Sequence, residues 1–153
     1  MTTIFQENEV SLSLLAEHLE NSGWNVELER DGLKLVTTAG LCFYIGLDDE
    51  RKFLNLTSFF RIRKSFEDSY DLVNKLNSHV FLPSFLLDDD GDLMINYVMT
   101  YERGLILAQF MRIVRRFAGV LSHVLTTYDP EEQIFLLRTS SAAVSDGNPI
   151  SLQ

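Results

Sequence analysis

Two stretches of this chain, residues 26–62 and 80–101, alternate apolar with polar residues and are broken by short turn sequences. An alternation of period two is typical of strands with one buried face, because successive side chains in a strand point to opposite sides of the sheet. The turn sequences that separate the runs are Asp31-Gly32, Ala39-Gly40, Asp48-Asp49-Glu50 and Asp89-Asp90-Gly91. Strands joined by turns this short pair with antiparallel neighbours. The sequence therefore predicts an antiparallel sheet.

The strand predicted over residues 53–62 has two unlike faces. The apolar positions of one face are Leu54, Leu56, Phe60 and Ile62. The alternation leaves Phe53 and Phe59 on the other face. The strand predicted over residues 41–47 places Cys42 and Tyr44 opposite its own apolar side. We expect the first face to be buried and the second to carry aromatic surface.

Helical periodicity predicts three helices, over residues 11–21, 65–77 and 104–128. Gly23 follows the first helix, where a C-cap favours glycine. Ser65 and Asp68 have the S-x-x-D spacing of a helix start and open the second. Together with the strands, these helices predict an α+β domain.

The third helix is apolar over a wider stripe than one sheet face requires. Phe110, Met111 and Phe117 are interpreted as lying beyond that stripe. The extra surface can be covered by residues 134–136, by a second subunit or by a client peptide. An apolar band of this size left bare on a monomer would be unusual.

At 153 residues, 46% of them hydrophobic, the chain suits one globular domain with a sizeable core. We place this domain at residues 1–130 and interpret residues 131–153 as a partly mobile C-terminal tail. The formal net charge is −9. A surface this acidic repels phosphate groups, so nucleic acids and anionic membranes are disfavoured as partners.

One apolar segment, residues 105–125, approaches the length of a membrane span. Arg112, Arg115 and Arg116 lie in its middle, where each charge costs roughly 2.5 to 3.5 kcal/mol to insert. The first residues of the chain lack the basic start and apolar run of a signal peptide. These features predict a cytoplasmic protein.

The acidic run that ends in Gly91 and Asp92 invites comparison with a calcium-binding EF-hand loop. With Gly91 as the sixth loop residue, the first and twelfth ligand positions fall on Leu86 and Tyr97. An EF-hand takes its ligands from acidic side chains at both positions, and it lies between helices rather than strands. The run is therefore interpreted as a solvated hairpin turn.

No other pattern in the sequence supports catalysis or metal binding. His18, His79 and His123 match no metal-ligand spacing. Cys42 lies within an apolar strand without a basic neighbour and is interpreted as a buried structural cysteine. Serine-nucleophile and phosphate-loop motifs do not occur. We therefore predict no catalytic residue, no metal and no cofactor.

One segment joins aromatic and basic residues in this acidic chain, Phe59-Phe60-Arg61-Ile62-Arg63-Lys64. It is either a local binding patch or a strand whose end happens to be basic. Exposed apolar residues are common on protein surfaces, which favours the second interpretation.

The element order, together with Val73-Asn74-Lys75-Leu76-Asn77 and Asp89-Asp90-Gly91-Asp92-Leu93, resembles the bacterial YbjN family over residues 11–128. Its members are described as sensory transduction regulators. The resemblance implies the fold of type III secretion chaperones, a twisted antiparallel sheet with helices packed against it. Those chaperones are small, acidic, often dimeric proteins that hold an extended segment of a client. The family supplies no catalytic residue to carry over.

The leading hypothesis is a non-enzymatic regulatory or chaperone-like adaptor, expected as a homodimer, that binds protein. Its predicted contacts are Phe53 and Phe59 on the sheet and Phe110 and Phe117 on the long helix. The main alternative is a small-molecule sensor that holds its ligand between the sheet and the long helix. A structural subunit of a larger complex, or an enzyme with a site assembled from distant residues, are further alternatives, the enzyme ranking last.

Overall fold

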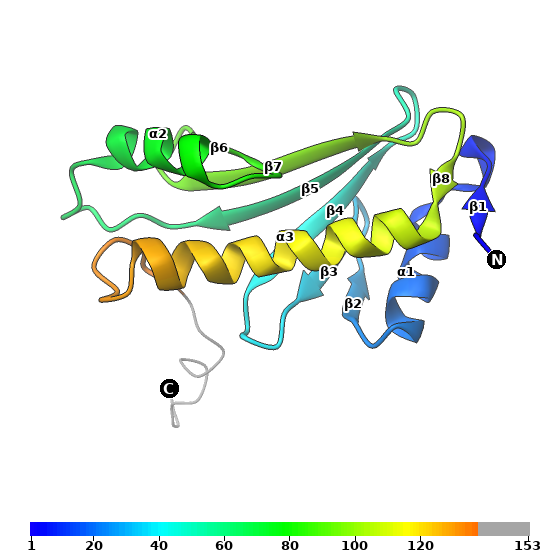
Figure 1. The fold of residues 1–153 in the computed structure, drawn as a ribbon, viewed down its shortest axis with the longest axis horizontal. Coiled ribbons are helices and arrows are strands. Elements are labelled where there is room, and N and C mark those ends of the chain that lie inside the picture. Colours follow the sequence, from blue (N-terminus) through cyan, green and yellow to red (C-terminus); the bar gives the residue numbers. More distant parts are fainter. Residues whose placement is uncertain (138–153) are drawn as a thin grey trace.

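Six strands form one twisted antiparallel sheet in the computed structural model, which describes residues 1–137 (Figure 1). In spatial order they are β2 (Asn25–Leu28), β3 (Leu33–Val36), β4 (Cys42–Asp48), β5 (Phe53–Phe60), β7 (Leu93–Thr100) and β6 (Ser84–Leu87). Strands β4 and β5 lie within two residues of the strands predicted over residues 41–47 and 53–62, and the other four fall, to within one residue, inside the two alternating stretches. The helices are α1 (Leu12–Asn21), α2 (Ser69–His79) and α3 (Leu107–Tyr128). The predicted α+β class is confirmed.

The helices share one hydrophobic core with one face of the sheet. The longest, α3, runs across the sheet, while α1 lies beside β2 and α2 beside β6 (Figure 1). Phe43 on β4 lies near the centre of this core, with its ring centroid 5.3 Å from that of Phe117 on α3. Trp24 meets the ring of Phe43 edge to face and so packs against this core.

The ends of α1 follow from local capping. The side-chain oxygen of Ser11 accepts a hydrogen bond from the N–H of Leu14 (3.1 Å), which satisfies one free donor of the first turn. Gly23 adopts φ +95° directly after the C-cap, a conformation that costs glycine little. The predicted position of this helix is confirmed.

The predicted start of α2 at Ser65 is wrong. Phe66 donates its N–H to the carbonyl of Arg63 (3.0 Å) and packs against the core, so the chain turns here instead of beginning a helix. The helix begins at Ser69, and its side facing the core carries Leu72 and Leu76. The S-x-x-D pattern is purely local and does not register this tertiary contact.

The N-terminal residues form a small second sheet that the sequence did not predict. Strand β1 (Ile4–Phe5) pairs with β8 (Leu105–Ile106), directly before α3. A short 3-10 turn, η1 (Glu7–Glu9), follows β1. The carbonyl of Thr3 accepts the N–H of Leu107 (3.0 Å) and thereby satisfies one free donor at the start of α3.

The segment after α3 returns to the sheet. Phe135 is buried, its ring lies 5.3 Å from that of Phe60, and it forms a bridge with Ile62. The first part of the predicted 131–153 tail therefore packs with the domain, and the rest of that tail, residues 138–153, lies outside the described residues. Within residues 1–137, no helix has both the length and the apolar character needed to cross a membrane.

Candidate protein-binding surfaces

The sheet has a covered face and an open face. Apolar open-face residues that stand outside the core cluster are Val36, Tyr44, Phe53, Phe59, Leu86, Met94 and Val98. Phe59 is 52% exposed, whereas its neighbour Phe60, on the covered face, is 2% exposed. The faces predicted from the alternation are therefore the faces observed.

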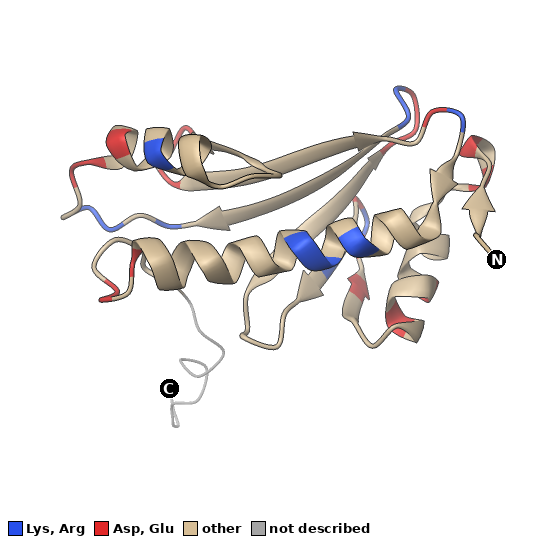
Figure 2. Cartoon of the chain, in the orientation of Figure 1, with Lys and Arg blue, Asp and Glu red and all other residues tan. Residues whose placement is uncertain are grey.

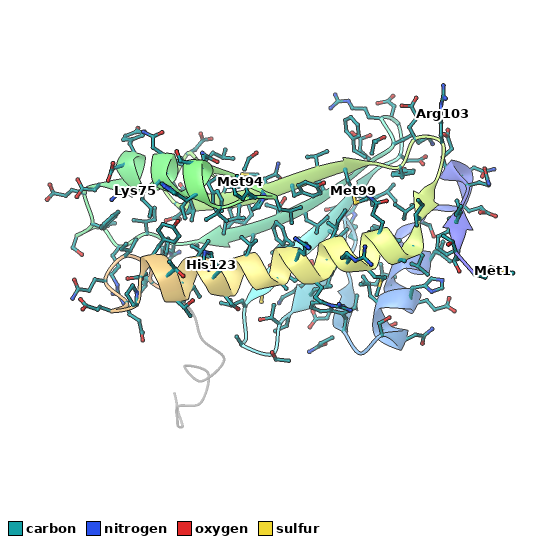
Figure 3. The ribbon with its side chains drawn as sticks, in the orientation of Figure 1. Met1, Lys75, Met94, Met99, Arg103 and His123 are labelled. Atoms are coloured by element: carbon teal, nitrogen blue, oxygen red, sulfur yellow. The ribbon has the colours of Figure 1, made fainter. Side chains whose placement is uncertain are left out.

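An apolar row crosses the open face from one side of the sheet towards the other. The apolar row consists of Leu86, Met94, Phe59, Cys42 and Val36, one residue from each of five adjacent strands. Within the row, Leu86 pairs with Met94, Met94 with Phe59, and Cys42 with Val36. The β4–β5 register, which pairs Tyr44 with Thr57, carries Cys42 opposite Phe59. At about 4.8 Å between strands, the row is roughly 19 Å long. Met94 is labelled in Figure 3.

Phe53 lies on the same face as Phe59 but at the far end of β5. The two are six positions apart, which corresponds to about 20 Å along a strand. The surface between them is polar, and there the hydroxyl of Thr57 donates to Oδ1 of Asn96 (3.0 Å). The structure therefore does not gather the predicted sheet contacts into one site.

The predicted contacts on the long helix are not surface residues. Phe110 and Phe117 are fully buried. They lie seven residues apart, which is two helical turns, so both occupy the centre of the stripe that faces the sheet. The apolar positions outside the buried stripe, such as Met111 and Val120, are half-buried against the core. Neither phenylalanine can contact a partner while α3 stays packed on the sheet.

The basic and aromatic segment 59–64 does not form a continuous patch. Its residues alternate between the core and the surface, with Phe60 and Ile62 buried and Arg61 exposed. Its backbone pairs with the returning C-terminal segment, because Arg63 donates its N–H to the carbonyl of Ile134 (2.8 Å). The interpretation as a strand end fits this arrangement.

The acidic run between β6 and β7 is a hairpin turn, as predicted. Oδ1 of Asp88 accepts the N–H groups of Asp90 and Asp92, each at 2.9 Å. Oδ1 of Asp92 accepts the N–H of Ile62 (2.9 Å). These carboxylates therefore fix the turn and the end of β5. Among residues 1–137, no group of three or more His, Cys, Asp or Glu side chains is placed to hold a metal ion.

The histidines and the cysteine lie apart from one another. His18 packs on Phe5, His79 bonds to the carbonyl of Lys75 (2.9 Å), and His123 lies on α3 (Figure 3). Cys42 is half-buried on the open face, so its interpretation as a fully buried residue is corrected. Its strand position is as predicted, but that face has no covering layer in the described structure.

One edge of the sheet is closed by a side chain. Nδ2 of Asn77 on α2 donates to the carbonyl of Phe85, and the N–H of Phe85 donates to Oδ1 of Asn77, both at 2.9 Å. Pro83, just before β6, has no N–H to offer. These features block the addition of a further strand to β6.

The opposite edge, β2, is open. Glu29 donates its N–H to the carbonyl of Gly32 (2.8 Å), which closes the β2–β3 hairpin. In an antiparallel pair the bonded residues alternate, so Glu27 bonds to β3 while Val26 and Leu28 direct their N–H and C=O groups outward. Leu28 is 58% exposed. Within residues 1–137 no strand pairs with this side of β2, so the edge presents outward backbone groups and an apolar side chain.

Acidic residues surround the open edge. Glu17 and Glu20 on α1 and Glu27 and Glu29 in the β2 hairpin are all exposed. Figure 2 shows acidic residues on both elements. Basic residues near the hairpin, Arg30 and Lys34, offset only part of this charge. The edge therefore favours a positively charged partner.

Comparisons with known proteins agree with the fold. A family model described as "YbjN: Putative bacterial sensory transduction regulator" matches residues 11–130. No curated protein sequence matches the chain. A crystal structure of YbjN from E. coli has a TM-score of 0.69 at 20% sequence identity and covers 84% of this chain and 97% of that chain.

Two further solved structures are similar in fold. A chain in the crystal structure of the ExsC–ExsE complex has a TM-score of 0.57 at 18% identity, over 75% of this chain and 90% of that chain. The Yersinia pestis type III secretion chaperone SycH, solved with a stable fragment of YscM2, has a TM-score of 0.50 at 15% identity, over 75% and 97%. The predicted chaperone-like fold is confirmed. At these identities the likeness shows the fold alone.

Proposed function

We propose that this chain, which belongs to the YbjN family, is a regulatory or chaperone-like adaptor that binds an extended segment of another protein. The observation that carries the proposal is the difference between the two edges of the sheet. Asn77 closes β6, whereas β2 presents outward backbone groups and an exposed Leu28. A sheet with one blocked edge and one unpaired edge can accept a strand of another protein at the unpaired edge.

In this mode the partner segment pairs with β2 as a seventh strand. The outward N–H and C=O groups of Val26 and Leu28 supply the backbone hydrogen bonds, each worth about 1 kcal/mol net. Leu28 contributes apolar contact to a side chain of the partner. The glutamates beside the edge select a basic segment and speed its association.

The solved relatives support a protein partner by analogy. ExsC is in a complex with ExsE, and SycH is in a complex with a fragment of YscM2. Their shared fold raises the expectation of protein binding without identifying a partner for this chain. Phe53 and Phe59 remain proposed protein contacts on the open face.

A ligand site between the sheet and the long helix is less well supported. The centre of that interface is filled by fully buried side chains, among them Phe43, Phe110 and Phe117. The aromatic contact of 5.3 Å between Phe43 and Phe117 spans it. A sensor would need space in this region for its ligand.

The test is capture of partners by the tagged full-length protein from the lysate of its host, with edge variants in parallel. Leu28→Lys places a charge on the open edge, and Ile4→Lys is the control, because the two side chains are 58% and 54% exposed. We expect stoichiometric protein partners that Leu28→Lys loses and Ile4→Lys retains. Equal capture by both variants, or no partner with any form of the protein, would contradict the proposal.

A further inference from the structure

Arg63 carries a guanidinium group that makes no ion pair in the described part of the chain. Its Nε is buried and has no hydrogen-bond partner within residues 1–137. None of the three ion pairs among these residues includes Arg63. Buried polar groups of native proteins are nearly always hydrogen-bonded, and an exception is explained by strain, by function or by a bound group. The space beside Arg63 decides whether a bound group is the explanation.

A cleft of about 350 Å³ lies beside Arg63, at the C-terminal end of α3. It is bounded by that end of the helix, by the connection between β3 and β4 and by the returning C-terminal segment, so it lies beyond the filled centre of the helix–sheet interface. His123, labelled in Figure 3, marks this end of α3. Small-molecule sites begin at about 300 Å³, so the cleft suits a small ligand. Its apolar lining residues are Ala39, Leu41, Leu125, Phe135 and Leu137.

The polar lining of the cleft favours a ligand with a single negative charge. The guanidinium of Arg63 can donate two parallel hydrogen bonds to a carboxylate, and the hydroxyl of Ser122 is a further donor. Asp129 and Glu132 also line the cleft and repel anions. The oxygens of Asp129 are occupied by three backbone N–H groups, and Glu132 is exposed, so that solvent screens its charge. The repulsion that remains disfavours ligands with two negative charges, such as phosphate esters.

We propose that this cleft binds a monocarboxylate that carries a small aliphatic or aromatic group. The carboxylate lies against the guanidinium of Arg63 and supplies the partner that the described chain does not, while the apolar group packs against Leu125 and Phe135. Inorganic anions have no group that uses the apolar lining, so they bind less tightly. The described lining residues do not include any of β2. The site is therefore independent of the strand addition proposed above, and either can fail without the other.

The first test is titration calorimetry of the full-length protein with sodium octanoate. We expect one octanoate bound to each chain. Arg63→Met keeps a long unbranched side chain without the charge and should bind about tenfold to hundredfold more weakly, since hydrogen bonds to a charged group are lost. Arg61→Met is the matched control, because Arg61 is exposed and does not line the cleft, and it should bind octanoate as the wild type does. Equal affinity of Arg63→Met and the wild type would overturn the proposal.

The choice of probe separates the contributions of the charge and of the apolar group. Octanamide lacks the charge and acetate lacks the apolar group, so each should bind at least about tenfold more weakly than octanoate. If neither octanoate nor 3-phenylpropionate binds the wild type, the cleft is not a monocarboxylate site. A free acid and the C-terminal carboxylate of a peptide share this chemistry. Tighter binding of N-acetyl-leucyl-leucine than of octanoate identifies the end of a polypeptide as the ligand, and the reverse order identifies a free acid.

The second test measures thermal unfolding of the same proteins. A side chain kept for a ligand adds little to stability or lowers it, so Arg63→Met without ligand should unfold at a temperature no lower than the wild type. At 100 times its wild-type Kd, octanoate should raise the midpoint of the wild type and of Arg61→Met by roughly 5 to 10 °C. The rise for Arg63→Met should be less than half as large. A much lower midpoint of Arg63→Met without ligand would assign the guanidinium a structural role and refute the site.

Discussion

The carboxylate of Asp129 accepts a hydrogen bond of 2.9 Å from the backbone N–H of Phe135. The same side chain accepts the N–H groups of Gln133 (2.7 Å) and Ile134 (3.0 Å). Asp129 follows the last residue of α3 and is 7% exposed. This one carboxylate therefore turns the chain after the helix and holds the returning segment against β5.

Replacing Asp129 by Asn should loosen this return. An amide has one acceptor oxygen, and its NH₂ group faces backbone donors that it cannot bond. We expect the free energy of unfolding to fall by about 1 to 3 kcal/mol, measured by urea denaturation. Glu131→Gln, at an exposed position nearby, is the control and should change it by less than about 0.5 kcal/mol. Equal stability of the two variants would show that the carboxylate does not hold the segment.

Truncation of Phe117 and of Phe59 to alanine should lower the free energy of unfolding by different amounts, because one side chain is in the core and the other on the surface. Phe117→Ala removes a fully buried ring and should cost about 3 to 5 kcal/mol of unfolding free energy. Phe59→Ala removes a ring that is 52% exposed and should cost less than about 1 kcal/mol in dilute protein. Both are measured by chemical denaturation. A large loss for Phe59→Ala would mean that the open face is covered within a single chain.

The strand faces could be predicted because alternation is a local property. Period-two spacing assigned Leu54 and Phe60 to one side of β5 and Phe59 to the other, and the burial of these residues agrees. The same reasoning failed on α3. Phe110 and Phe117 share a face by their seven-residue spacing. Because many other apolar residues flank them on the helix, the sequence pattern did not show that this face is the buried one.

The closed edge and the small second sheet could not be predicted from the sequence. Asn77 meets Phe85 through a tertiary contact between α2 and β6. The pairing of Ile4 with Ile106 joins two-residue strands from distant parts of the chain. Neither feature has a periodicity of its own, because too few residues take part in it.

Asn77→Asp tests the closure of the β6 edge. The carboxylate keeps the size of the amide and can accept from the N–H of Phe85, but it cannot donate to the carbonyl of Phe85. We expect a loss of about 1 kcal/mol in unfolding free energy and faster exchange of the Phe85 amide hydrogen. Asn74→Asp, on the exposed part of α2, is the control. Unchanged exchange at Phe85 in Asn77→Asp would argue against a protective role for this side chain.

Tyr101 should make the stability of the fold sensitive to alkaline pH. Burial raises its pKa above the ordinary value of 10.0, and the nearby carboxylate of Asp49 raises it further. Its hydroxyl lies 3.4 Å from Oδ1 of Asp49. Because the folded state holds this proton more tightly than the unfolded chain, the contribution is fully present below the unfolded pKa. It is lost as pH rises through the folded pKa.

Tyr101→Phe removes the titrating group and should flatten the fall of unfolding free energy that begins near pH 10 in the wild type. The measurement is urea denaturation at a series of pH values from neutral to strongly alkaline. Tyr70→Phe removes a phenol that is 80% exposed, and its curve should follow the wild type. If Tyr101→Phe instead loses stability as steeply as the wild type above pH 10, other groups govern alkaline unfolding and the buried phenol does not.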